Sequence, residues 1–197
     1  MTTSEKVYSL IEQNSGYLTA KDARDNGVEN KALQRMAARG LIERVTHGLY
    51  ISEDTFPDQF YVTQYRCPKG VFSHETALFL HDLSDRYPLR LMMTIPSGWN
   101  TQLLTDKNML FFYNGQKRMR YGACEIETPS GVKVIAYDTE RTLCDCLRSI
   151  DKLDRDLVLS AYKRYVKSSV RNSAKLLDYA AAFNIRDTVY RYLEVLA

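Results

Sequence analysis

Cationic and amide side chains gather in one short stretch of the sequence. Four of them fall within nine residues: Lys31, Gln34, Arg35 and Arg39. Arginine and glutamine present paired hydrogen-bonding atoms that match base edges, whereas lysine presents a point charge suited to a phosphate. Apolar residues recur between them at the spacing of a helix: Ala32, Leu33, Met36 and Ala37. The pattern predicts a helix with a buried face and a polar face that either reads DNA or is merely solvated.

Capping and breaking residues predict how this helix is positioned. Thr19 offers a side-chain oxygen to cap a helix over Ala20–Asn26, and Gly27 permits the positive φ that ends it. Asn30 is the predicted cap of the second helix, Lys31–Arg39, which ends at Gly40. Two short helices joined by a tight turn that contains glycine form a helix-turn-helix.

A hairpin is predicted directly after the second helix. Two β-capable runs flank the turn Thr46-His47-Gly48, and together they form the wing of a winged helix. In such a module the second helix enters the major groove and the wing contacts backbone or minor groove. A helix over Ser4–Asn14, capped by Ser4, and a strand at Tyr17-Leu18 that pairs with the wing complete it. The predicted DNA-binding residues are Thr19, Lys21, Asn30, Lys31, Gln34, Arg35, Arg39, Arg44, Thr46 and His47.

Composition sets the broad class of the protein. The chain has 197 residues with 45% hydrophobic and 26% charged residues, which is typical of a folded protein. The net charge is only +3, and residues 1–58 carry seven basic against nine acidic residues, which counts against a DNA-reading module there. The four cysteines lack CxxC spacing, the start resembles no signal peptide, and no apolar run approaches the roughly 20 residues that span a bilayer. We therefore expect a cytoplasmic protein without a membrane segment.

The second part of the chain has a different pattern. A connector with Phe56-Pro57 predicts a boundary between a winged-helix domain at 1–56 and a second domain at 57–197. After a short helix over Phe60–Tyr65, the second domain is expected to hold a helix capped by Ser73, strands at Leu89–Ile95 and Met109–Tyr113, and a hairpin of Tyr121–Thr128 with Val132–Tyr137. Helices are then expected at Asp138–Ser149, Arg155–Ser168, Ser173–Phe183 and Ile185–Leu196. The fold class is α+β, with a small β-sheet and several helices.

Two clusters in this domain could hold a metal ion or do acid–base chemistry. His74 and His81 are two helical turns apart, but zinc needs three or four ligands and Glu75 and Asp82 point elsewhere. A helix cap for His74 and a partly buried packing position for His81 fit better. The carboxylates Asp138, Glu140 and Asp145 fit an N-cap, a first helical turn and an ion pair with Arg141. We predict no catalytic residue, no metal and no cofactor.

The last helices carry a second basic surface. Its cations are Lys163, Arg164, Lys167, Arg171, Lys175, Arg186 and Arg191. Five tyrosines are interleaved with them: Tyr162, Tyr165, Tyr179, Tyr190 and Tyr192. Tyrosine next to Arg or Lys can stack on bases and grip phosphates. The alternative is that the tyrosines pack inward and the cations form an ordinary solvated face.

Three phrases of the sequence resemble a known family. GVFSHETALFLHDLSDRYPL, the strand end TIPSG and GVKVIAYDTERTLCDCLR are similar to the AbiEi antitoxins of bacterial type IV toxin–antitoxin systems, which act in abortive infection by phage. The resemblance covers essentially the whole chain. It implies a transcriptional autorepressor that binds inverted repeats upstream of its own operon. It also implies a carboxy-terminal domain that counteracts a nucleotidyltransferase-like toxin without a stable complex.

Two functions from different classes therefore remain. The first is a DNA-binding autorepressor and antitoxin, expected to be a monomer that pairs on double-stranded DNA. The second is a protein-interaction module, in which the winged helix binds protein and the second domain sequesters a partner directly.

Overall fold

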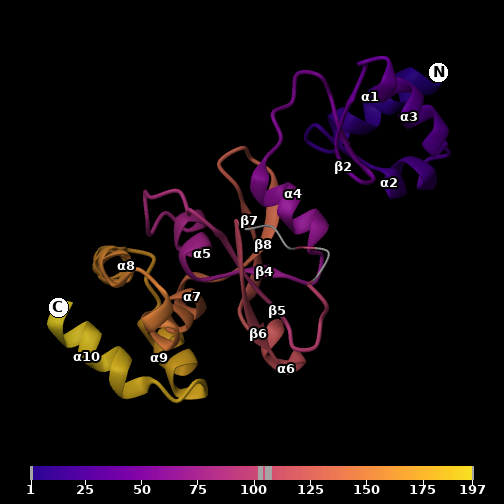
Figure 1. Cartoon of the computed structure of the whole chain (residues 1–197). Coiled ribbons are helices and arrows are strands. Elements are labelled where there is room, and N and C mark those ends of the chain that lie inside the picture. Colours follow the sequence, from indigo (N-terminus) through magenta and orange to yellow (C-terminus); the bar gives the residue numbers. More distant parts are fainter. Residues whose placement is uncertain (1, 102–103, 105–107, 197) are drawn as a thin grey trace. The chain divides into compact units, whose positions relative to one another are not determined.

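The computed structural model describes residues 2–101, 104 and 108–196 (Figure 1). The chain divides into two compact units. Unit 1 comprises Met1–Tyr65 with Ser130–Val132, and unit 2 comprises Arg66–Pro129 with Lys133–Ala197. Unit 1 extends past residue 56 because Tyr17 holds the segment that follows: its hydroxyl oxygen accepts from the backbone N–H of Asp58 at 2.7 Å, and its ring lies 4.3 Å from that of Tyr61.

Unit 1 is a winged helix. Its elements are α1 Thr3–Gln13, β1 Tyr17–Thr19, α2 Ala20–Asp25, α3 Asn30–Ala38, β2 Glu43–Thr46, β3 Leu49–Ile51 and α4 Gln59–Arg66, whose last residue belongs to unit 2. The three strands form an antiparallel sheet in the order β1-β3-β2. The predicted helix-turn-helix, the wing and the pairing of Tyr17-Leu18 with the wing are confirmed.

Two of the helix caps predicted for unit 1 are wrong. Thr2, not Ser4, caps α1, because its hydroxyl accepts from the backbone N–H of Glu5 while the Glu5 carboxylate accepts from the N–H of Thr2 at 2.7 Å. This reciprocal capping box satisfies two helix-end donors at once. Asn30 is the first residue of α3, and Glu29 precedes it without a side-chain capping bond.

One face of each of α1, α2 and α3 is buried in a common core. Val7, Leu10 and Ile11 of α1 pack with Leu33 and Met36 of α3, and further residues of α2 and the wing complete the cluster. The spacing of these residues follows the helical period, so the opposite face of α3 stays outside.

Unit 2 is built on a five-stranded mixed sheet. Its strands are β4 Val71–Phe72, β5 Leu91–Pro96, β6 Met109–Asn114, β7 Ala123–Glu127 and β8 Lys133–Tyr137. They are ordered β6-β5-β4-β8-β7. The predicted hairpin is the antiparallel pair β7–β8. The two-residue central strand β4, which pairs with β5 and β8, was missing from the prediction because it is too short to show a period.

Helices fill the rest of unit 2. They are α5 His74–Leu80, α6 Gln116–Met119, α7 Thr139–Arg148, the 3-10 helix η2 Ile150–Lys152, α8 Arg155–Lys167, α9 Ser173–Ala182 and α10 Arg186–Leu196. In Figure 1 the orange and yellow helices α7–α10 gather on one side of the sheet. Their core includes Leu143, Val158 and Leu176. Within the described ranges, every helix is too short or too polar to traverse a lipid bilayer.

Candidate nucleic-acid interface

Helix α3 separates its side chains into two faces. Ala32, Leu33 and Met36 are buried against the core of unit 1. Lys31 and Gln34 lie on the exposed face, together with the other polar residues of the helix. This is the arrangement that the apolar spacing predicted, and it leaves hydrogen-bonding groups on the side of the helix that faces away from the core.

The structure places the predicted DNA-binding residues in two groups. Eight are exposed: Lys21, Asn30, Lys31, Gln34, Arg35, Arg39, Arg44 and His47. Thr19 and Thr46 are half-buried. The Thr19 hydroxyl is already engaged, since it accepts from the backbone N–H of Asp22 at 2.9 Å and donates to the Asp22 carboxylate at 2.6 Å. Thr19 therefore positions α2, as its predicted capping role requires.

Arg35 lies along its own helix beside a surface cavity. Its Nε donates to the backbone carbonyl of Lys31 at 3.3 Å, one turn earlier. The cavity has a volume of about 340 Å³, and Arg35 and Arg39 line it from α3 while Thr3 and Ser4 line it from the start of α1. The capping box of Thr2 and Glu5 already occupies two N–H groups of this helix start, so it is the two cations, Arg35 and Arg39, that favour an anion such as a DNA phosphate.

Thr3 and Ser4 were absent from the predicted site. The sequence does contain a signal for them, since the capping box of Thr2 and Glu5 marks where α1 begins. What it lacks is the packing of α1 on α3, which brings the start of one helix beside the arginines of the other.

The wing is fixed at its turn. Gly48 has a φ of +74°, and its carbonyl accepts from the backbone N–H of Ala20 at 2.7 Å. The Tyr65 hydroxyl donates to the His47 carbonyl at 3.3 Å. Arg44 and His47 also join their side chains, with 2.9 Å between Arg44 Nη2 and His47 Nδ1. A guanidinium only donates, so Nδ1 of His47 accepts and the wing presents Arg44 in a defined position.

The predicted second basic surface is mostly tied to acidic residues and backbone carbonyls of unit 2. Arg164 pairs with Asp85, Arg171 donates to the carbonyl of Val166, and Lys175 lies 3.1 Å from an oxygen of Asp138 and 3.6 Å from one of Glu140. Three of the interleaved tyrosines are buried: Tyr162, Tyr165 and Tyr179. Arg191 also donates to a backbone carbonyl, that of Asp187. All of the seven cations except the half-buried Lys175 are nonetheless exposed. The buried tyrosines are in the positions expected of the inward-packing alternative.

His74 and His81, which were considered above as possible metal ligands, both have partners within unit 2. His74 is not a helix cap: it is 3% exposed, its ring stacks on Phe112 at 3.5 Å, and its nitrogens face the hydroxyls of Ser73 and Ser149. Burial, reinforced by the charge of Arg141, lowers the pKa of His74 to about 3, so its ring is neutral. The half-buried His81 donates from Nε2 to the carbonyl of Tyr137 at 2.7 Å.

The three carboxylates that could have formed a metal or acid–base site have the structural roles that their helix positions predicted. Asp138 caps α7 by accepting from the N–H of Arg141 at 2.9 Å. Asp145 forms a buried ion pair with Arg141, 2.8 Å between Asp145 Oδ2 and Arg141 Nε. Glu140 is buried and accepts from the hydroxyl of Tyr165 at 3.1 Å. Each carboxylate thus has a structural partner within α7 or its neighbours.

The winged helix of unit 1 matches a known protein family. Residues 5–52 match the family model described as "Transcriptional regulator, AbiEi antitoxin". This segment is similar to the AbiEi antitoxin regulators. The match begins within α1 and ends just after β3, so it contains the helix-turn-helix and the wing. It supports an antitoxin and regulator role for the chain.

The family match covers about a quarter of the chain, and the phrases between residues 70 and 148 that resemble AbiEi lie outside it. The matched family is described as one of transcriptional regulators. A search of curated proteins finds no match.

Proposed function

We propose that the protein is a DNA-binding autorepressor that recognises inverted repeats upstream of its own operon. The observation that carries this proposal is the exposed face of α3, where Lys31, Gln34 and Arg35 project from a helix whose other face is locked into the core. A helix held in this way enters the major groove as a rigid body, and its side chains reach base edges. One monomer on each half-site pairs on the DNA.

Arginines near the exposed face of α3 are proposed to bind DNA phosphates, which raises the affinity for DNA of any sequence. Arg39 and Arg35, beside the start of α1, are positioned to hold one phosphate, and Arg44 on the wing is positioned to hold another. Because each neutralised phosphate releases counterions, the binding constant is expected to fall steeply with salt. Unit 1 carries excess acidic charge outside this face, so affinity for random DNA stays modest.

We also propose that unit 2 counteracts a nucleotidyltransferase-like toxin in the cytoplasm without forming a stable complex with it, as in type IV systems. The AbiEi match of the winged helix and the resemblance of the later phrases support this assignment. The competing idea, a module that sequesters its partner directly, predicts that the toxin copurifies with this chain. Size-exclusion chromatography of the mixed proteins separates the two ideas.

A mobility-shift titration on the upstream operon DNA tests the DNA proposal. Sequence-specific retardation is expected, together with its loss in the variant with Lys31, Gln34 and Arg35 replaced by Ala. Each lost base contact weakens binding by about 1–3 kcal/mol. All three side chains are exposed, so the variant keeps its fold, which circular dichroism checks.

The matched control is Lys152→Ala, which removes an exposed cation of unit 2 outside every predicted surface. It should bind operator DNA like the parent protein. Lys163→Ala with Lys167→Ala tests whether the second basic surface extends the footprint. Equal affinity of the parent protein for scrambled DNA would overturn the proposal, because only non-specific electrostatic binding would then remain.

A further inference from the structure

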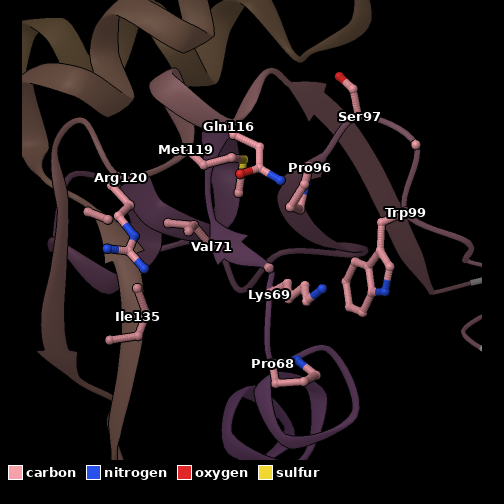
Figure 2. A pocket seen from close by; sticks show the side chains of 13 residues that line it. Pro68, Lys69, Val71, Pro96, Ser97, Trp99, Gln116, Met119, Arg120 and Ile135 are labelled. Carbon is pink, nitrogen blue, oxygen red and sulfur yellow. The ribbon is translucent and has the colours of Figure 1, made fainter.

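Unit 2 contains a cavity that neither DNA binding nor the family match explains. It has a volume of about 620 Å³, within the range of sites for small molecules. Apolar side chains line part of it: Val71 of β4, Pro96 of β5, Met119 of α6 and Ile135 of β8. Figure 2 shows Val71 in the middle of the view, with Met119 and Pro96 on one side and Ile135 on another.

Groups suited to a charged, flat ligand line the rest of the cavity. They are Lys69, Trp99, Gln116 and Arg120. In Figure 2 Lys69 extends toward the Trp99 indole, and Arg120 lies on the opposite side of the view. None of the described residues that line the cavity is acidic. The local charge therefore favours an anion.

The two cations are unpaired within the described part of the chain. No hydrogen bond or ion pair joins the side chain of Lys69 or Arg120 to another described residue, whereas Lys175 and Arg141 of the same unit are matched to carboxylates. Unpaired cations beside an apolar hollow are available to an incoming anionic group.

The backbone fixes both sides of the cavity. Gly70 lies so close to Cys67 and Met93 that a Cβ there would come within 2.6 Å of the Cys67 sulfur and 2.7 Å of the Met93 methyl carbon, so the chain carrying Lys69 is pressed onto the sheet. A turn after β5 places Trp99, whose backbone N–H donates to the Pro96 carbonyl at 3.1 Å, and Gly98 supplies a φ of +84° within that turn. The cavity is therefore built by the fold.

We propose that this cavity binds a mononucleotide. The Trp99 indole offers a π-face for the base, since aromatic side chains stack on any base. Lys69 and Arg120 bind the phosphates, and the Gln116 amide is placed to hydrogen-bond the base or the ribose. The apolar floor of Val71 and Met119 covers the remaining face of the ligand. The proposal is independent of DNA binding by unit 1.

The chain contains a single tryptophan, so its fluorescence reports on this cavity directly. The full-length protein is titrated with ATP, GTP, CTP and UTP, with correction for absorbance, and calorimetry repeats the titration. We expect saturable quenching with at least one of them. Lys69→Ala and Arg120→Ala should each weaken binding by about tenfold or more, the effect of losing a charge-assisted hydrogen bond.

Lys117→Ala is the matched control, because Lys117 is an exposed cation on α6 that does not line the cavity. It should leave the affinity unchanged. Trp99→Ala, measured by calorimetry, should weaken nucleotide binding while circular dichroism shows that the fold is kept.

Three results would each overturn the assignment. One is the absence of saturable binding up to millimolar concentration of all four nucleotides. Another is that inorganic triphosphate binds as tightly as the nucleotides, which would leave an anion site without base recognition. The third is that adenosine binds as tightly as ATP, which would leave Lys69 and Arg120 without a role.

Discussion

Replacing Asp145 with Asn isolates the effect of a charge buried inside α7. Asp145 is 3% exposed, and its two oxygens accept from Arg141 Nε at 2.8 Å and Arg148 Nη1 at 3.0 Å. Arg141 has no exposed surface at all, whereas the Arg148 side chain is 30% exposed. In Asp145→Asn, Arg148 can turn to water, but the guanidinium of Arg141 stays buried without its counter-charge.

The size of the effect follows from the other contacts of Arg141. Breaking a buried ion pair by removing one partner destabilises a protein by about 3–5 kcal/mol. Here the carbonyl of Tyr121 still accepts from Arg141 at 2.8 Å, and the rings of Tyr137 and Phe183 lie 4.3 and 4.4 Å from its guanidinium carbon. These contacts compensate in part, so we expect Asp145→Asn to lower the free energy of unfolding of unit 2 by about 3 kcal/mol.

Urea unfolding followed by tryptophan fluorescence measures this value, because the one tryptophan of the chain, Trp99, belongs to unit 2. The control is Asp151→Asn. Asp151 pairs with Arg155, also four residues away, but the two side chains are 84% and 71% exposed. Water and salt screen such a pair, so its loss should lower the free energy of unfolding by less than about 1 kcal/mol.

A double variant sharpens the test. Arg141→Met with Asp145→Leu removes both charges and leaves no orphaned ion, so it should destabilise unit 2 less than the sum of the two single changes. The reasoning is refuted if Asp145→Asn and Asp151→Asn lower the free energy of unfolding equally, or if the double variant shows simple additivity.

Two further predictions concern a buried histidine and a helix cap. The pKa of His74 is lowered to about 3 by burial, while the unfolded chain has the ordinary value of 6.5, so the unfolded state binds more protons between these values. The free energy of unfolding should therefore fall by about 2 kcal/mol between about pH 7 and about pH 5. The dependence should flatten in His74→Asn, which tolerates the φ of +52° there; an unchanged slope in denaturant titrations would contradict it. Thr19→Ala should lower the stability of unit 1 by about 1 kcal/mol, because Thr19 caps α2. Thermal unfolding followed by circular dichroism checks this, with Thr19→Ser as the variant that should retain the cap.

Local signals in the sequence were sufficient for most of unit 1. Thr19 caps α2, and the positive φ of Gly27 and Gly40 ends the two helices where the sequence predicted. Such signals act within one or two turns of chain, so they survive in any tertiary setting. The same logic placed Asp138 at the start of α7 and paired Arg141 with Asp145, because a helix brings residues four apart together.

Other features depended on contacts between distant segments. His74 was predicted to cap a helix, yet it is buried against Phe112 and Ser149, which lie 38 and 75 residues further along the chain. The central strand β4 has two residues and gains its identity only from β5 and β8 on either side. The cavity beside Trp99 collects residues from the starts and ends of several elements.

The sequence by itself determined the helix-turn-helix, the wing, the polar face of α3 and the class of fold, because periodicity and capping are encoded within a few residues. Only the tertiary structure decided which charged and aromatic side chains are buried, and it alone brought α1 beside Arg35 and Lys69 near Trp99. The physical reason is that burial and proximity arise when distant segments pack, and no local pattern of residues specifies that packing.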